Sequence, residues 1–316
     1  MVKYIIQFST DFHLMVALAA IPDASNNKIL MLGPRTSLAI KVASYLQSEF
    51  FDIDAREPKV TIFEAFKLLV NQNKYGEVVI VSPFVYPFFA AMAAKKNGDT
   101  VKSIVRTDEG IGSYASVTHY YTALRLEGQL SVLGALKRAL AKKSAMWVTK
   151  SFRICKEMYL FKSDLTIDQT ISERLRFILE NLGLSKQLDN CVVYVSQPYV
   201  VSSFESGQCY ADFIKLIAGH CGEGLRFIIK KHPRDDFDYE SYGFDVACGM
   251  PLETYSLNNS VVFGFSSTAL LMAKFFSNCR DAYFIKMDGF GPFYNNMSAM
   301  NRNLFDNYLK CIDSKI

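Results

Sequence analysis

Two adjacent acids and a glycine, Asp108, Glu109 and Gly110, follow the run VKSIVR at residues 101–106. A chain that leaves a buried strand here places a carboxylate at the strand end, and the glycine permits a sharp turn beyond it. Such a carboxylate can act as a general base and remove a proton from an incoming hydroxyl. Taken alone, the three residues favour a plainer interpretation, an acidic turn that caps the next helix.

A histidine between an apolar run and a proline is the second candidate. His232 follows LRFIIKK and precedes Pro233, and its basic neighbours are Lys230, Lys231 and Arg234. Proline fixes the backbone, so the imidazole is held at the predicted strand end. A positive site of this kind suits a phosphate, to which the imidazole can donate a hydrogen bond or a proton. A surface turn is the alternative.

Three hydroxyl residues, Ser266, Ser267 and Thr268, come after the apolar run SVVFGF. They predict a helix N-terminus whose N–H groups and hydroxyls form an anion site. A simple cap by Ser266 would use the same donors, so the two interpretations do not exclude each other.

An acid in the segment MPLETYS is the fourth candidate. Glu253 follows Pro251 closely, and its carboxylate could accept two hydroxyl hydrogens from a ribose. The alternative is an exposed glutamate at the start of a helix.

Metal-binding patterns are weak in this sequence. The pairs Asp52/Asp54 and Asp236/Asp238 have the Asp-x-Asp spacing that can hold a divalent cation, but neither lies in an identifiable nucleotide-binding context. We interpret both as incidental and expect no metal. The sequence contains no GxxxxGK[ST], HExxH or GxSxG motif.

The elements that must position these residues alternate along the chain. In the first half, apolar runs predict strands and amphipathic stretches predict helices, a pattern typical of a parallel sheet covered on both faces. The predicted strands are 3–8, 28–33, 77–82, 101–106 and 157–162; the predicted helices are 11–20, 35–50, 86–98, one or two within 115–143, and 172–184.

A polar stretch at 185–190 precedes CVVYVSQP, where the alternation starts again. We therefore expect two consecutive Rossmann-like α/β domains, 1–185 and 186–298, that face a cleft. A last helix within 299–316 could pack back on the first domain. Ligands are expected at the carboxyl ends of the strands.

Composition limits the possible functions. The chain has 316 residues, half of them hydrophobic, which suits two cores and argues against disorder. A net charge of +4 is too small for a general nucleic-acid binder, so no nucleic acid is expected as a partner. Seven cysteines without a C-x-x-C spacing favour a reducing compartment, and we expect a cytoplasmic protein.

One predicted helix is basic and amphipathic. Its cations stand among Leu133, Leu136 and Leu140; they are Lys137, Arg138, Lys142, Lys143 and Lys150. The helix either has a solvated face or makes peripheral contact with an anionic membrane surface such as the inner membrane.

The acidic pair with glycine, the His-Pro pair and the serine pair occur in one order between residues 107 and 268. This combination resembles the bacterial sialyltransferases, the polysialyltransferase and lipooligosaccharide sialyltransferase families, which share [DE][DE]G, HP and Ser/Thr-rich motifs. The resemblance implies a GT-B fold and metal-independent transfer of sialic acid, with inversion, from CMP-sialic acid. The acceptor would be a hydroxyl of a cell-surface glycan (lipooligosaccharide, O-antigen or capsule), and no cofactor is expected besides the donor.

The resemblance also implies roles for single residues. Asp108 would be the general base, with Glu109 as the alternative, because this chain has Asp-Glu where those families have Glu-Asp or Asp-Asp. His232 would bind the departing phosphate and act as general acid. The residues expected to bind the CMP sugar or to shape its site are Gly110, Lys231, Pro233, Glu253, Ser266, Ser267 and Thr268.

Other functions stay open from the sequence. They are another GT-B transferase, for instance one that uses CMP-Kdo, a nucleotide-sugar hydrolase or epimerase, and a non-catalytic nucleotide- or sugar-binding protein of the same fold. Arg106 and Tyr114 flank the acidic motif and are candidates for acceptor contacts.

Overall fold

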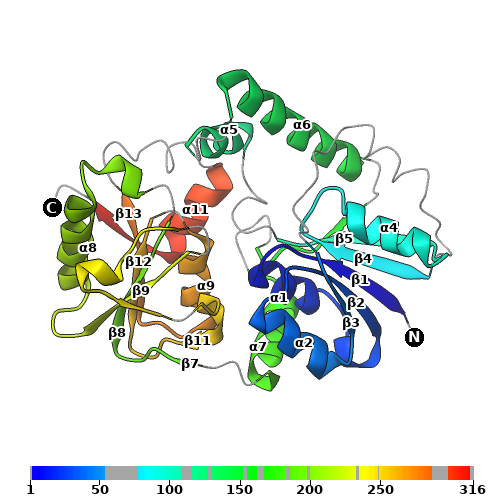
Figure 1. The fold of residues 1–316 in the computed structure, drawn as a ribbon, viewed down its shortest axis with the longest axis horizontal. Helices are drawn as coiled ribbons and strands as arrows, with labels where there is room; N and C mark the ends of the chain where they lie inside the picture. The colour runs from blue at the N-terminus through cyan, green and yellow to red at the C-terminus, as the bar shows by residue number, and fades with distance from the viewer. Residues whose placement is uncertain are drawn as a thin grey trace. The chain divides into compact units, whose positions relative to one another are not determined.

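The structure is a computed structural model of the chain (Figure 1). It describes residues 2–313 apart from 54–76, 109–115, 127–129, 152–154, 162–166, 183–185, 198–199, 233–234, 248, 266 and 287–297. The chain folds into two compact units. Unit 1 comprises Met1–Ser113 and Val132–Gly183, and unit 2 comprises Tyr114–Ser131 and Leu184–Ile316.

Unit 1 is built on a six-stranded sheet with the order β3-β2-β1-β4-β5-β6, in which every neighbouring pair is parallel. The strands are β1 (Lys3–Gln7), β2 (Lys28–Gly33), β3 (Glu49–Asp52), β4 (Val78–Ser82), β5 (Val101–Arg106) and β6 (Cys155–Glu157). The central strand β4, VVIVS, is buried over its whole length because helices cover both faces of the sheet.

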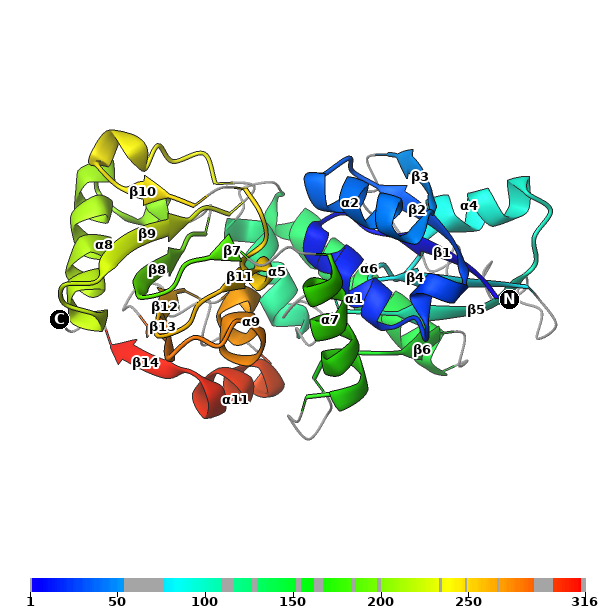
Figure 2. The same ribbon diagram turned by 90° about the horizontal axis from the view of Figure 1, so that it is seen from below.

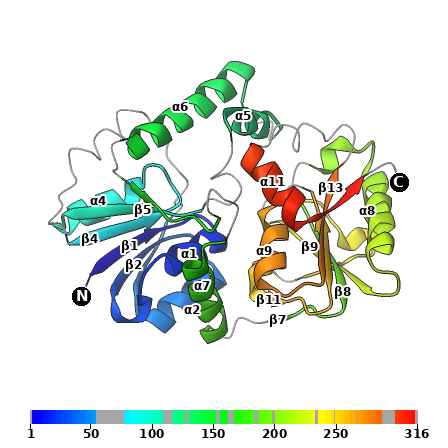
Figure 3. The ribbon, with the colours of Figure 1, turned by 180° about the vertical axis from the view of Figure 1, so that it is seen from behind.

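Helices cover the two faces of this sheet unequally. On one face lie α1 (Asp11–Ala19), α2 (Ser37–Leu46) and α7 (Gln169–Asn181), and α4 (Phe88–Lys96) lies on the other (Figure 1, Figure 3). α1, α2 and α7 each begin after an N-cap residue whose side chain accepts a main-chain N–H, namely Thr10, Thr36 and Asp168. The long helix α6 (Val132–Ser151) contacts the edge strand β6.

Unit 2 repeats this topology. Its parallel sheet has the order β10-β9-β8-β12-β13-β14. The strands are β8 (Cys191–Val195), β9 (Arg226–Lys230), β10 (Asp245–Val246), β12 (Val261–Gly264), β13 (Asp281–Lys286) and β14 (Lys310–Asp313). Two short strands, β7 (Lys186–Gln187) and β11 (Tyr255–Ser256), pair separately.

Helix α8 (Gly207–Cys221) covers one face of the second sheet, and α9 (Thr268–Phe276) and α11 (Ala299–Tyr308) cover the other (Figure 2). The core between α8 and the sheet is rich in aromatic side chains, including the buried Tyr194, Tyr210 and Phe263. α5 (Val117–Leu126) is also grouped with this unit. The short 3-10 helices are η1 (Ala24–Asn26), η3 (Val201–Ser203), η4 (Glu240–Tyr242) and η5 (Leu252–Thr254).

Three predicted elements differ from the structure. The helix predicted over 35–50 ends at Leu46, and Glu49–Asp52 forms the edge strand β3 instead. The strand predicted over 157–162 is β6 at Cys155–Glu157. The last helix, α11, ends at Tyr308, after which Lys310–Asp313 pairs with β13.

The described part of the C-terminal segment belongs to unit 2. α11 packs against α9, and its Phe305 ring lies 5.6 Å from that of Phe284 in β13. A contact of this segment with the first domain stays a prediction. Among the described residues, no helix combines the length and hydropathy needed to cross a bilayer.

Candidate functional site

Several of the predicted site residues that the structure describes come just after the carboxyl ends of strands. In unit 1, Thr107 and Asp108 directly follow β5, and in unit 2, Lys231 and His232 directly follow β9. Ser267 lies three residues after the end of β12. Parallel sheets with this strand order bind ligands along this edge, near the point where the order reverses.

Asp108 is buried, with 2% of its surface exposed. Its Oδ2 accepts a hydrogen bond from the main-chain N–H of Leu160, which follows the neighbouring strand β6. The carboxylate thus joins the ends of two paired strands, rather than lying in a solvated turn. Glu109 and Gly110 lie outside the described residues.

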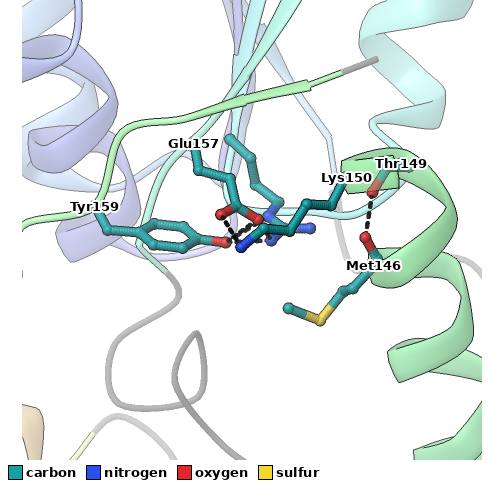
Figure 4. A network of polar contacts seen from close by, with 6 residues as sticks. Met146, Thr149, Lys150, Glu157 and Tyr159 are labelled. Atoms are coloured by element: carbon teal, nitrogen blue, oxygen red, sulfur yellow. Dashed lines mark hydrogen bonds and ion pairs between the residues drawn. The ribbon is translucent and has the colours of Figure 1, made fainter. Parts of the chain in front are cut away.

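A charged network fixes the strand end that carries Asp108. The Arg106 side chain is 4% exposed, and its Nη2 forms an ion pair with Glu157 Oε1. Its Nε donates to the Tyr159 hydroxyl at 2.7 Å. Figure 4 shows Lys150 of α6 reaching the same carboxylate, with Nζ 3.4 Å from Glu157 Oε2. Arg106 is therefore part of this network. An acceptor contact by Arg106 stays a prediction, and Tyr114 lies outside the described residues.

Burial changes the protonation chemistry of this network. Burial alone would lower the pKa of the Arg106 guanidinium, but Tyr159 and Glu157 outweigh it and raise that pKa. Burial raises the pKa of the Tyr159 hydroxyl, which stays a neutral donor and acceptor. Burial also raises the pKa of the adjacent Cys155 thiol to about 11, so Cys155 is not an activated nucleophile.

In unit 2, His232 is half-buried at the end of β9. Its main-chain N–H donates to Ser196 Oγ at 2.9 Å, and Ser196 follows the neighbouring strand β8. Its carbonyl accepts the N–H of Asp235 at 3.0 Å. Lys230 is buried, and its Nζ lies 3.3 Å from the Lys231 carbonyl, so positive charge lies next to the histidine. Pro233 and Arg234 lie outside the described residues.

A chain of hydroxyls runs from the core of unit 2 to this loop. Tyr239 donates to Asp235 Oδ2 at 2.8 Å, and its oxygen lies 2.9 Å from the Tyr210 hydroxyl. Tyr210 in turn lies 2.8 Å from the Tyr194 hydroxyl. Because each phenol has one proton, Tyr210 must donate to Tyr239, and Tyr194 to Tyr210. Burial raises the pKa of all three hydroxyls, which keeps these donors protonated.

The N-terminus of α9 provides a second set of donors. The helix begins at Thr268, and its N-cap is Ser267, whose Oγ accepts the N–H of Ala269 at 3.3 Å. The simple cap predicted at Ser266 is therefore wrong by one residue, and Ser266 itself lies outside the described residues. β9 and β12 are the two neighbours of β8 in the sheet. Because adjacent strands lie about 4.8 Å apart, the axes of β9 and β12 are roughly 10 Å apart.

Glu253 lies in η5, which packs against α9. Only 8% of its surface is exposed. The alternative of an exposed glutamate at a helix start is therefore wrong about the exposure, although Glu253 does lie in the first turn of η5. A buried carboxylate in this segment is compatible with binding hydroxyl groups of a ligand.

Two aspartates of the Asp-x-Asp pairs accept hydrogen bonds from nearby main-chain N–H groups. Asp52 Oδ1 accepts the N–H of Arg35 at 3.1 Å, and Asp54 lies outside the described residues. Asp238 Oδ1 accepts the N–H of Ser241 at 3.3 Å, and Asp236 is exposed. No group of three or more His, Cys, Asp or Glu side chains in the described part of the chain is arranged to hold a metal ion.

Several site residues were missed from the sequence. Ser196 and Gln197 are buried directly after β8, and only their place behind a buried apolar run could have indicated them. Asp235, three residues after His232, is also buried, and nothing in the local sequence predicts this burial.

No protein-family model matches the chain, and no curated protein sequence matches it. Among solved structures, it is similar to a Photobacterium sp. JT-ISH-224 2,6-sialyltransferase, with 11% identity, a TM-score of 0.53 and coverage of 98% of this chain and 78% of that chain. The chain has a GT-B fold. The GT-B fold predicted from the sequence is thereby confirmed, with two six-stranded parallel sheets of the same strand order.

Two further GT-B structures are also similar to the chain. A Photobacterium phosphoreum α/β-galactoside α-2,3-sialyltransferase has 12% identity and a TM-score of 0.47, with 98% of each chain covered. A Neisseria meningitidis UDP-GlcNAc 2-epimerase has 11% identity and a TM-score of 0.42, with 99% of this chain and 88% of that one covered. At such identities the likeness concerns the fold alone. The cleft expected between the domains stays a prediction.

Proposed function

We propose that the chain is an inverting, metal-independent glycosyltransferase that moves sialic acid from CMP-sialic acid to a hydroxyl of a bacterial cell-surface glycan. The observation that carries this proposal is the carboxyl edge of unit 2. There, His232, the buried Lys230 and the N-terminus of α9 lie at the ends of strands that flank β8. Imidazole, ammonium and helix N–H groups are the donors that a phosphate requires.

The proposed reaction has two sides. On the acceptor side, Asp108 takes the hydroxyl proton as the oxygen attacks the anomeric carbon, with Glu109 as the alternative base. On the donor side, the bond from the anomeric carbon to the phosphate oxygen breaks, and its electron pair goes to the phosphate of CMP. His232 donates a hydrogen bond or a proton to that phosphate, and Ser267 with the N-terminus of α9 stabilises its charge. The attack comes opposite the departing phosphate and inverts the anomeric carbon.

The choice of a CMP sugar rests on the order of the Asp-Glu-Gly, His-Pro and Ser-Ser motifs and on the burial of Glu253, which we assign to the ribose. One similar structure, the 2,6-sialyltransferase, is a ternary complex with the donor product CMP and the acceptor lactose. By analogy, we propose CMP-sialic acid as donor and a galactoside or sialoside as acceptor.

A donor panel tests the proposal. The purified chain is incubated with CMP-sialic acid, CMP-Kdo or UDP-GlcNAc, each with and without galactosides and sialosides, and the products are identified by mass spectrometry. We expect transfer from CMP-sialic acid, and slow release of CMP when no acceptor is present. His232→Ala should lose the reaction, whereas His220→Ala on the exposed side of α8 should keep it. Neither transfer nor hydrolysis of CMP-sialic acid, or a preference for another donor, would contradict the proposal.

A further inference from the structure

Helix α6 has an unusual charge for a protein whose basic and acidic residues are almost equal in number. Its twenty residues, Val132–Ser151, contain no aspartate or glutamate. All of its charged residues are cations: Lys137, Arg138, Lys142, Lys143 and Lys150. The helix itself therefore contributes only positive charge, part of which Glu157 balances through Lys150.

The fully buried residues of α6 are small. Ala135, Ala139, Ala145 and Thr149 are the buried members of this helix. Near the C-terminus of the helix, Lys150 joins the network of β6 through Glu157 (Figure 4). Met146 of α6 is partly buried and packs against Val85 and Ala145. α6 is therefore held by small side chains, by Met146 and by an ion pair, and four of its large apolar residues take no part in this packing.

Four large apolar residues of α6 face solvent. We call Leu133, Leu136, Leu140 and Trp147 the outer face of α6; they are 69%, 40%, 48% and 69% exposed. At 3.6 residues per turn, these four positions fall within an arc of about 60°, on the side opposite the buried alanines. An amphipathic helix of a water-exposed protein normally has the reverse arrangement, with its large apolar side chains packed on the core.

Cations border the outer face on both sides. From helical geometry, Lys137 flanks it on one side, and Lys143 and Lys150 flank it on the other; Lys150, 73% exposed, also pairs with Glu157. Long basic side chains next to exposed leucines and a tryptophan are typical of helices that lie in the interface of a lipid bilayer. The apolar side chains enter the boundary between headgroups and acyl chains, while the ammonium groups stay near the phosphates.

We propose that the outer face of α6 docks on an anionic lipid surface. Two facing copies of α6 would bring Lys137 and Arg138 of each copy together without a single acid from either helix, so the charge disfavours a second copy as the occupant. A purely electrostatic partner would leave the four apolar side chains unused. An anionic bilayer satisfies both features at once, because its headgroups attract the basic residues and its acyl boundary accepts the apolar side chains.

The chain supplies its own probe, because Trp147 is its only tryptophan. Its fluorescence is recorded with vesicles of phosphatidylcholine alone and with vesicles that contain phosphatidylglycerol. With the anionic vesicles, we expect emission at shorter wavelength, quenching by brominated acyl chains and co-flotation of the protein, all weakened by salt. The zwitterionic vesicles should produce much smaller effects.

Variants separate the apolar and the electrostatic contributions to vesicle binding. Leu133→Asn with Leu136→Asn should lower the vesicle affinity by on the order of tenfold or more, and Lys137→Glu with Arg138→Glu should do so mainly at low salt. Leu216→Asn, at a 52% exposed position of α8, is the matched control and should bind like the unmodified chain. Circular dichroism checks that each variant is folded.

Three outcomes would overturn the proposal. They are no change in Trp147 emission with anionic vesicles, equal binding to both kinds of vesicle, and a shift that appears without lipid as the protein concentration rises. The last result would identify a second copy of the chain as the occupant.

Discussion

The main-chain N–H of His232 donates to the hydroxyl of Ser196 at 2.9 Å, which ties the end of β9 to the end of β8. Ser196 is fully buried, and its own N–H donates to the carbonyl of Lys230 at 3.1 Å. The imidazole proposed to meet the phosphate is thus positioned by a hydroxyl on the next strand.

Ser196→Ala should weaken the affinity for CMP by about tenfold, because the His232 N–H loses its acceptor and the loop after β9 shifts. Titration calorimetry with CMP measures this effect. Ser203→Ala, an exposed serine of η3, is the control and should leave the affinity unchanged. An unchanged affinity for Ser196→Ala would show that this hydrogen bond does not position the histidine.

Tyr239→Phe should destabilise unit 2 more than Tyr194→Phe does. Removing the Tyr239 hydroxyl leaves Asp235 Oδ2 without that donor and Tyr210 without its acceptor, and we expect a loss of about 1–3 kcal/mol. Tyr194 is at the end of the chain of hydroxyls, so its loss affects only the oxygen of Tyr210 and should cost about 1 kcal/mol. Urea unfolding followed by circular dichroism compares the two, and equal losses would contradict the direction assigned to the chain.

Glu157→Gln should lower the free energy of unfolding by about 3 kcal/mol, because it leaves the buried charge of Arg106 without its carboxylate. Lys150→Ala removes a partner whose side chain is 73% exposed, and its effect should stay below about 1 kcal/mol. Both values come from urea unfolding. If Lys150→Ala were the more damaging variant, the network would depend on the lysine and not on Arg106.

Alkaline pH should destabilise the chain. Burial raises the pKa of Cys155 and Cys279 from 9.0 to about 11 in the folded state. Below pH 9.0 these thiols are protonated in both states, and their contribution to stability is fully present. Between pH 9.0 and about 11 the unfolded chain releases protons that the folded chain retains, so stability falls as pH rises.

The pH dependence is measured as the urea midpoint in this range. Cys155→Ser should flatten it, whereas substitution of the exposed Cys209 serves as the control. A midpoint that stays constant across the range would contradict the burial of these thiols.

Buried strands were predictable from the sequence, and edge strands were not. β4 and β8 are continuous apolar runs because both faces of each strand are covered. β3, with the sequence EFFD, is mostly exposed at the sheet edge, and β14, KCID, buries one residue of four. Neither strand has a long apolar run, and no proline marks the end of the helix before it. The sequence pattern therefore predicts that each helix continues through the residues that form β3 and β14.

For the candidate site, the sequence predicts which residues follow strand ends, but not the hydrogen bonds that hold them. Asp108 and His232 could be placed at strand ends because an apolar run and a change to polar residues mark such ends. The hydrogen bond from His232 to Ser196 joins residues 36 positions apart. The contacts of Asp235 likewise depend on how β8, β9 and α8 pack, which local sequence does not encode.

The most direct test is the affinity for CMP, measured by calorimetry on two variants. Asp108→Asn should bind CMP like the unmodified chain while its transfer from CMP-sialic acid is lost, and Glu109→Gln should retain more transfer. His232→Ala combined with Ser267→Ala should weaken CMP binding by about tenfold or more. If Asp108→Asn loses CMP binding and the double variant keeps it, the assignment of the base to unit 1 and of the phosphate site to unit 2 is wrong.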